Sequence, residues 1–333
     1  MNHLRGKKPG MPRFDVTIAG ELNLDLILYG LPAELPPERE LLAQQMALTL
    51  GSSSAIVAHN LAAMGRRVGF VSRIGEDPLG QIAVERLAAG GVDVTGVRRT
   101  RDRKTGLTVI VQRQGWRNIL TYPGTIFELR LADLDFDYLT DAEHFHLSSF
   151  YLQKNLTPHV KELFHRVKAA DLTISLDTND DPEDQWDNGL IEVLQYVDVL
   201  LPNERELLRI AKTEDFDTAL TRLAEKVPLV VVKMGERGAI AQSGKERMSS
   251  PAAKVNFVDP VGAGDSFDAG FLSQYVRGAG LRTCLEWGNA AGALSTTMPG
   301  GTEAFRDRAV VEAFLRERLP GTRWPYGPTS SRR

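Results

Sequence analysis

Short, continuously apolar segments alternate along most of this chain with segments of helical length. Strands that are apolar without alternation are buried on both faces, which is typical of a parallel sheet covered by helices. We therefore predict an α/β fold: a doubly wound, mostly parallel sheet with helices on both faces. The candidate strands span residues 14–20, 68–75, 144–149, 172–179, 197–203 and 229–235.

Polar residues at the ends of these strands indicate where a site would lie. Open parallel sheets bind their ligands beyond the carboxyl ends of the strands. Asn179, Asn203 and Lys233 stand at such ends in the sequence. We therefore expect the functional residues to gather along that edge of the sheet.

Two segments interrupt this alternation. Residues 24–50 carry a strand-like LDLILYG and then a loop rich in Pro and Glu, and within residues 97–125 an alternating stretch turns at Gly115 and Trp116. Such a stretch predicts an antiparallel hairpin. We expect both segments to form a small β-sheet lid on one domain that spans residues 13–320, with flexible tails at 1–12 and 321–333.

Composition narrows the functional class. The net charge of −3 over 333 residues gives no sign of a surface for nucleic acid or for a membrane. No apolar run approaches the ~18 residues of a transmembrane helix. Cys284 is the sole cysteine, so no intrachain disulfide can form and a cytoplasmic location is expected.

The stretch DPVGAGDSFDAGF, residues 259–271, places a carboxylate directly behind a glycine-rich turn at the start of a helical pattern. Backbone N–H groups at such a turn form an anion-binding nest. Asp265 could accept the proton of an attacking hydroxyl while the nest holds a transferring phosphoryl group. The alternative is an ordinary helix start with an acid in its first turn. No phosphate-binding G-x-x-x-x-G-K-[ST] motif occurs.

From about Phe14 to Thr302 the chain resembles the ribokinase-like (PfkB) carbohydrate kinases. DPVGAGDSFDAGF resembles the C-terminal signature of that family, residues 50–80 its N-terminal glycine-rich signature, and PNERE, residues 202–206, its Asn-x-x-Glu motif. The resemblance implies that Asp265 is the catalytic base and that Gly262, Ala263 and Gly264 form the anion hole. It also implies that Glu206 reaches Mg²⁺ through water.

The same resemblance assigns the remaining contacts. Sugar binding falls on Asn23, Asp25, Gly51, Ser52 and Ser53, and ATP binding on Asn203, Lys233, Gly235, Gly238 and Asn289. Asp259 falls where some members hold a monovalent cation such as K⁺. Val261 stands where a Thr is usual at that cation site, so a backbone carbonyl would have to replace its side chain.

Departures from the family pattern concern the substrate. Ile56 stands where members commonly have Asn, and Asp181 where sugar-acid and fructose kinases have Arg. A missing Arg argues against an anionic substrate group at that point. Arg117 in the hairpin is either a contact for an anionic substrate or a solvated charge. His144 and His146 share a strand face, which suits either a metal site or a structural role.

The prediction is an ATP- and Mg²⁺-dependent kinase of a small sugar-like substrate, with K⁺ as a further candidate ion. Two alternatives stay open: a nucleoside kinase of the same fold, for which Ile56 would suit an apolar ring, and a ligand sensor without catalysis. Because sheet edges readily pair between chains, we also expect a homodimer formed through the lid.

Overall fold

The computed structural model describes residues 11–113 and 116–319, so apart from residues 11 and 12 the predicted tails lie outside the described residues, as does Gly115 of the predicted turn. A nine-stranded sheet runs through this part of the chain in the order β13-β12-β11-β10-β9-β8-β1-β4-β5. Strands β5 to β11 of this order pair in parallel, whereas β12 and β13 are antiparallel. The strands are β1 (Phe14–Ala19), β4 (Val68–Gly75), β5 (Asp93–Thr100), β8 (Ala142–Leu147), β9 (Thr173–Leu176), β10 (Val199–Leu200), β11 (Leu229–Lys233), β12 (Ala239–Ser243) and β13 (Glu246–Ser250). The predicted doubly wound sheet is confirmed.

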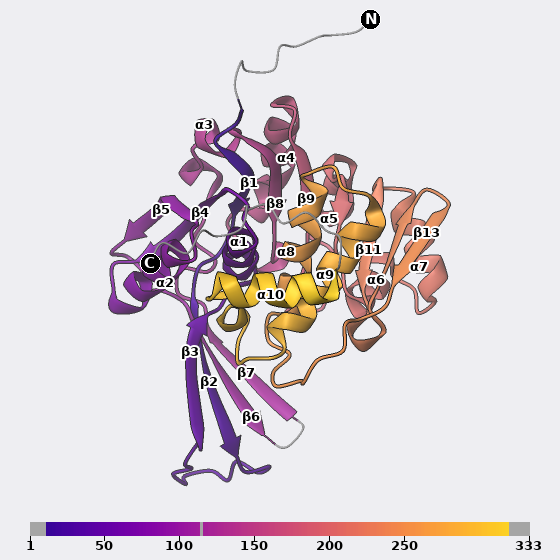
Figure 1. The fold of residues 1–333 in the computed structure, drawn as a ribbon. Coiled ribbons are helices and arrows are strands. Elements are labelled where there is room, and N and C mark those ends of the chain that lie inside the picture. Colours follow the sequence, from indigo (N-terminus) through magenta and orange to yellow (C-terminus); the bar gives the residue numbers. More distant parts are fainter. Residues whose placement is uncertain (1–10, 114–115, 320–333) are drawn as a thin grey trace, which may run out of the picture.

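Helices cover both faces of this sheet (Figure 1). Successive residues of β11 contribute to opposite faces of the sheet: Val231 belongs to one apolar core, and Val230 and Val232 belong to the other. The first core is closed by α1 (Ser53–Ala63), α2 (Pro78–Ala89), α8 (Ala263–Tyr275), α9 (Leu281–Ser295) and α10 (Arg308–Arg318). The second is closed by α3 (Phe136–Leu139), α4 (Val160–Ala169), α5 (Leu190–Val193), α6 (Glu204–Ala211) and α7 (Phe216–Ala224). Burial on both faces explains why the strands are continuously apolar.

A second sheet projects from the large one (Figure 1). Its order is β3-β2-β6-β7, formed by β2 (Leu24–Leu31), β3 (Gln45–Leu50), β6 (Leu107–Arg113) and β7 (Trp116–Tyr122). We call these four strands the lid. The pairing of β6 with β7 is antiparallel, as the alternating sequence predicts.

The lid boundary needs one correction. Residues 97–100, expected in the lid, belong to β5, which pairs in parallel with β4 in the large sheet. This strand is the edge of the sheet and is only partly buried, so its sequence carries charged residues where an internal strand would be apolar. The lid hairpin therefore begins at Leu107.

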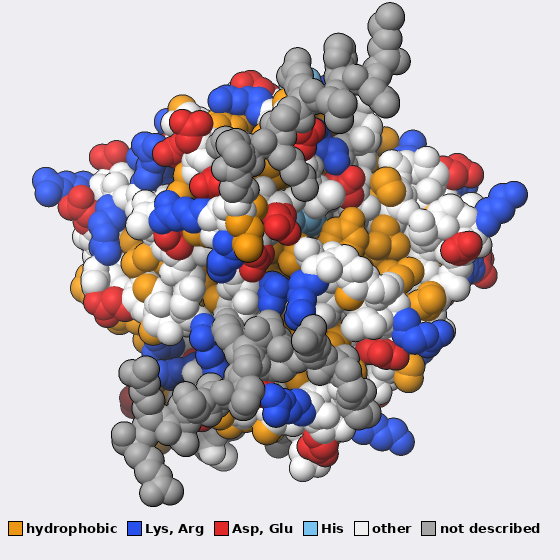
Figure 2. Space-filling view, turned by 45° about the horizontal axis from the view of Figure 1, so that its top comes forward, with side chains coloured by type: hydrophobic (Ala, Val, Ile, Leu, Met, Phe, Trp, Pro, Cys, Tyr) orange, Lys and Arg blue, Asp and Glu red, His pale blue; other side chains and the backbone are white. Residues whose placement is uncertain are grey.

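The strand order changes direction beside β1. From β1 the chain proceeds to β4 and β5 on one side and returns to β8 on the other. Loops that leave the carboxyl ends of two such strands diverge, and ligands bind between them. Within the described ranges, no helix is long and apolar enough to cross a membrane. On the face in Figure 2, basic and acidic side chains are interspersed.

Candidate active site

The turn before α8 has the geometry of an anion site. Gly262 is the N-cap with a φ of +72°, and a Cβ there would lie 2.4 Å from the Cα of Gly301. Both the left-handed conformation and the close approach require glycine. No side chain caps this end of α8 among the described residues. First-turn N–H groups of an uncapped helix are free to bind an anion, and the helix dipole favours one.

Asp265 lies in the first turn of α8 and is 8% exposed. Burial and the nearby Asp177 carboxylate raise its pKa to about 7, against the opposing effects of Lys233 and of a hydrogen bond with the Ser53 side chain. A carboxyl group with such a pKa can exchange a proton near neutral pH. The contact with Ser53 brings the predicted substrate loop against the predicted base.

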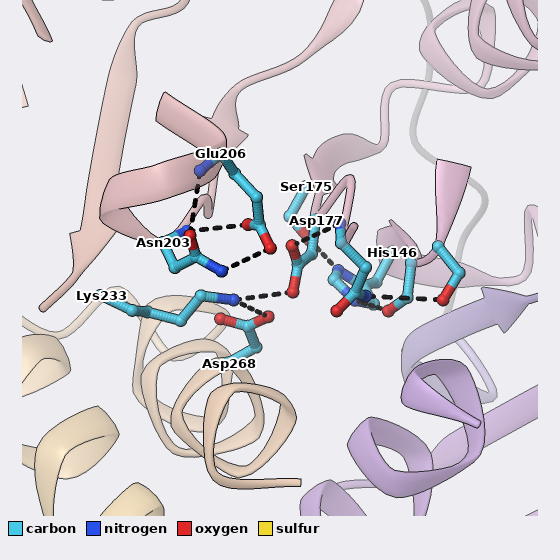
Figure 3. Close-up of polar contacts among 10 residues, drawn as sticks. His146, Ser175, Asp177, Asn203, Glu206, Lys233 and Asp268 are labelled. Atoms are coloured by element: carbon cyan, nitrogen blue, oxygen red, sulfur yellow. Dashed lines mark hydrogen bonds and ion pairs between the residues drawn. The ribbon is translucent and has the colours of Figure 1, made fainter. Parts of the chain in front are cut away.

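Behind this turn, Lys233 lies between two carboxyl groups (Figure 3). Its Nζ donates to Asp177 Oδ2 at 2.7 Å and to Asp268 Oδ2 at 3.1 Å, and a Cβ on Gly264 would lie 3.6 Å from that Nζ. The ammonium is therefore next to the anion-hole turn. Neither Asp177 nor Asp268 was given a role from the sequence. The sequence does contain indications of both residues, because Asp177 follows a buried strand and Asp268 stands three residues after Asp265 on the same helix.

The two carboxyl groups on Lys233 have pKa values that are shifted in opposite directions. Burial opposes ionisation of Asp177, but Lys233 outweighs it and holds the pKa of Asp177 below its usual range. Burial raises the pKa of Asp268 well above its usual range, and Asp177 adds to that effect against the attraction of Lys233. The pKa of Lys233 is itself raised, since the nearby carboxylates outweigh the effect of burial. Lys233 therefore favours the ionised form of Asp177, whereas burial favours the neutral form of Asp268.

Asn203 and Glu206 begin α6 as a reciprocal capping box (Figure 3). The Asn203 side chain accepts from the Glu206 N–H at 3.0 Å, and Glu206 Oε2 accepts from the Asn203 N–H at 2.8 Å. Burial and Asp177 raise the pKa of Glu206 to about 7, against the attraction of Lys233. A single parallel bridge joins Asn203 to Lys233, so two of the predicted strand ends do meet.

On the substrate side, the structure brings Asn23, Asp25 and Gly51 together. Asn23 Nδ2 donates to Asp25 Oδ1 at 3.4 Å, and a Cβ on Gly51 would lie 2.0 Å from that same oxygen. Only glycine therefore fits at position 51. Burial, Asp265 and Asp259 raise the pKa of Asp25 to about 7, while a hydrogen bond with Thr108 lowers it.

Ser52 has a structural task at the start of α1. Its Oγ donates to the carbonyl oxygen of Glu21 and accepts from the N–H of Ala55. Ile56, the apolar departure from the family pattern, lies against the anion-hole region instead of pointing to a free cavity, because a Cβ on Gly301 would lie 2.6 Å from its Cδ1.

The predicted nucleotide-side residues lie around the turn between β11 and β12. Gly235 and Gly238 have φ values of +58° and +88°, and a Cβ on Gly238 would lie 2.1 Å from the Ser250 carbonyl oxygen. Asn289 on α9 donates to that same oxygen at 3.0 Å. These three residues are thus brought together, although Asn289 already has a protein partner.

Asp181, which replaces the expected Arg, stabilises its own loop. Its carboxylate accepts from the N–H groups of Glu183, Gln185 and Trp186. Trp186 is buried and packs edge-on against Tyr151 with ring centroids 5.5 Å apart, which anchors this loop.

His144 and His146 join β8 to β9 through hydroxyl groups. Each ring lies 2.7 Å from Ser175 Oγ, and the other ring nitrogens lie 2.7 Å from Thr173 Oγ1 and Ser148 Oγ. Burial lowers their pKa values to about 3 and about 4. With all four ring nitrogens engaged, the pair has a structural role. In the described part of the chain, no group of three or more His, Cys, Asp or Glu is arranged to hold a metal ion.

Comparison with known proteins identifies the family. The model of the pfkB family carbohydrate kinases matches residues 13–308. The chain belongs to this family. It is similar to an ATP-dependent ribose-1-phosphate kinase from Halopiger xanaduensis, with 31% identity over 91% of this chain and 99% of the relative. It is also similar to a cytidine kinase from Thermococcus kodakarensis, with 28% identity over 82% and 93%.

Solved structures agree with this result. A ribokinase-like protein from E. coli, determined in complex with ATP and Mg²⁺, has a TM-score of 0.81 and 26% identity over 91% of this chain and 99% of its own. The pfkB family member described here is accordingly a carbohydrate kinase, as the sequence predicts.

Proposed function

We propose that this kinase transfers the γ-phosphoryl group of ATP to a hydroxyl group of a small sugar or sugar derivative, with Asp265 as general base. The position and the pKa of the Asp265 carboxyl group support this role. A buried carboxyl group with a pKa of about 7 stands at the uncapped N-terminus of α8 and in hydrogen-bond contact with the substrate loop. General bases work best when their pKa lies near the operating pH.

In the proposed step, the substrate hydroxyl oxygen forms a bond to the γ-phosphorus while the bond from that phosphorus to the β,γ-bridging oxygen breaks. Asp265 takes the hydroxyl proton, and ADP leaves. The first-turn N–H groups at Gly264 and Asp265 face the negative charge that spreads over the transferring group. Lys233, beside Gly264, adds a fixed positive charge.

The polar groups present also suit Mg²⁺. This ion prefers oxygen ligands and keeps several of its waters. Both carboxylate oxygens of Glu206 already accept hydrogen bonds from Asn203, so Glu206 could reach Mg²⁺ only through water. The nucleotide phosphates would supply the remaining ligands. When bound, Mg²⁺ neutralises part of the charge on those phosphates.

The decisive experiment measures ADP formation from Mg-ATP across sugars, sugar acids, sugar phosphates and nucleosides. Asp265→Asn keeps the shape of the side chain but cannot take the proton, so we expect turnover to fall by about 10²- to 10⁴-fold with ATP still bound. An Asn variant with nearly unchanged turnover would contradict the role of Asp265. The name of the Halopiger relative makes ribose 1-phosphate a natural member of the panel.

The panel also tests the two alternatives. The cytidine kinase among the relatives favours nucleosides as the second substrate class, and turnover confined to nucleosides would establish it. ATP binding without turnover on any acceptor would support a sensor. A sensor has no chemical use for a buried base beside a substrate loop.

We further propose a homodimer through the lid and a cytoplasmic location. The strand register places Met46, Leu120 and Tyr122 on one face of the lid, and each is more than half exposed. Exposed apolar faces of this kind mark association surfaces. The buried thiol of Cys284 suits a reducing compartment.

A further inference from the structure

Asp259, just before the anion-hole turn, has a fully buried carboxylate that accepts three hydrogen bonds. The N–H of Val261 donates to Oδ1 at 3.0 Å, and the N–H of Gly300 donates to Oδ2 at 3.1 Å. The third donor is the hydroxyl group of Tyr29, which lies 2.7 Å from Oδ2. Burial and the hydrogen bond to Asp259 raise the pKa of Tyr29, so this hydroxyl stays a donor at neutral pH.

The three donors come from three parts of the chain. Tyr29 lies on β2 of the lid, Val261 in the turn that leads into α8, and Gly300 in the loop that follows α9. The last two segments also touch each other, because a Cβ on Gly262 would lie 2.4 Å from Gly301. Asp259 is therefore the point at which the lid and both loops around the anion hole meet.

The inner face of the lid supports this junction. Tyr29 shares that face with Ile27 and Ile110, which form an apolar cluster with Val261. Thr49, on the same face, bonds the hydroxyl of Thr302 at 3.2 Å. The lid thus holds both the turn before the anion hole and the loop opposite it.

A monovalent cation does not fit this carboxylate. Three donors take up three of the roughly four lone-pair positions of its two oxygens, so at most one position is left for a cation, beside positively polarised hydrogens. The neighbouring Val261 offers no side-chain oxygen, and the adjoining lid residues Ile27 and Ile110 are apolar. The expected K⁺ contact at Asp259 therefore lacks a suitable set of ligands.

We propose that Tyr29 is a positioning residue: through Asp259, it holds the lid against the anion-hole turn and replaces a monovalent cation at that point. This inference rests on the proposed kinase reaction for its effect on rate, but not for the contact itself. Its consequences are that the reaction needs no monovalent cation and that loss of one hydroxyl group loosens together two loops that are far apart in the sequence.

The test compares Tyr29→Phe with Tyr122→Phe, which removes a hydroxyl group from the half-exposed outer face of the same sheet. Hydrogen–deuterium exchange is followed by mass spectrometry in peptides covering residues 259–264 and 299–303. We expect exchange in both peptides to be at least about fivefold faster in Tyr29→Phe than in the wild type, with no change in Tyr122→Phe. Equal exchange in the two variants would overturn the inference, and this measurement needs no acceptor.

The second readout uses ions. At equal ionic strength, the dissociation constant of Mg-ATP and the turnover on any acceptor found should differ less than about twofold between KCl and tetramethylammonium chloride. Tyr29→Phe should lower kcat about tenfold while the KM for ATP stays within about twofold, because the anion hole is displaced and the nucleotide site is not. If the turnover of the wild type depended strongly on K⁺, the proposal that Tyr29 replaces a monovalent cation would be wrong. Failure to find any acceptor would count against the proposed function alone.

Discussion

Lys233 contacts two carboxyl groups whose pKa values are shifted in opposite directions. The pKa of Asp177 is lowered by Lys233 despite burial, whereas burial raises the pKa of Asp268 well above its usual range. Because a buried cation without its anion is costly, Asp177→Asn should lower the free energy of unfolding at pH 7 by about 3 kcal/mol. Because the pKa shift of Asp268 favours its neutral form, Asp268→Asn should change this free energy by less than about 1 kcal/mol.

Urea denaturation of the two variants at pH 7 distinguishes them. They are matched controls for each other, since each replaces one carboxyl group in contact with the same ammonium by a carboxamide. Equal losses of stability would contradict the opposite directions of the two pKa shifts.

We expect the ionised form of Asp265 to destabilise the folded chain as the pH rises through 7. Its pKa is near 3.8 when unfolded and about 7 when folded, so the folded chain holds more protons than the unfolded chain between these values. The stability that it contributes is complete below about pH 4 and is lost as the pH rises through 7. Asp265→Asn should therefore unfold with a free energy about 2–4 kcal/mol higher than the wild type at pH 8, and with little difference at pH 4. Denaturant titrations at the two pH values test this, and a gap that does not depend on pH would contradict it.

At the scale of elements, the Asn-x-x-Glu motif serves two purposes, and one substitution separates them. Glu206→Gln retains the capping box, because glutamine also accepts from the N-cap N–H. Glutamine has one acceptor oxygen, so the hydrogen bond that Asn203 Nδ2 donates to Glu206 Oε1 is lost, and we expect the free energy of unfolding to change by about 1 kcal/mol. The charge that Mg²⁺ would meet through water is lost, so the Mg²⁺ concentration for half-maximal rate should rise about tenfold.

The matched control is Asp215→Asn, which changes an acidic cap at the start of α7, a helix whose N-cap is exposed. It should leave the Mg²⁺ dependence unchanged. If both variants shift the Mg²⁺ dependence equally, the effect comes from general charge and not from the motif.

Elements that depend on residues close together in the sequence could be predicted, whereas contacts between residues far apart in the sequence could not. The buried strands and the lid hairpin follow from apolar patterns within a few residues, whereas residues 97–100 of β5 were expected in the lid because an edge strand carries mixed residues. Asp265 and the anion-hole turn share one motif. The partners that set their chemistry do not, since Asp177 lies 56 residues before Lys233 and Tyr29 lies 230 residues before Asp259. Side-chain packing across the sheet brings these pairs together, and no short sequence motif contains both partners.

For the whole molecule, the lid has two faces with different surroundings. The inner face, with Asp25, Ile27 and Tyr29 of β2, lies against the loops of the active site. The outer face carries Leu120 at 59% exposure on β7, the edge strand of the sheet. An exposed apolar face beside an unpaired edge is unfavourable in a lone subunit, and association of two lids would remove both from water.

We therefore expect the wild type to scatter light at micromolar concentration with twice the chain mass of 36.7 kDa. Leu120→Asp places a charge in the apolar outer face and should shift the mass toward that of one chain, because a buried unpaired carboxylate would destabilise the interface. Ile191→Asp is the control, since Ile191 is an exposed apolar residue on α5, away from the lid. A monomeric wild type, or equal masses for the two variants, would contradict association through the lid. If Leu120→Asp is monomeric yet keeps its kcat, each active site is complete within one chain, as the contacts of Asp265 and Asp259 indicate.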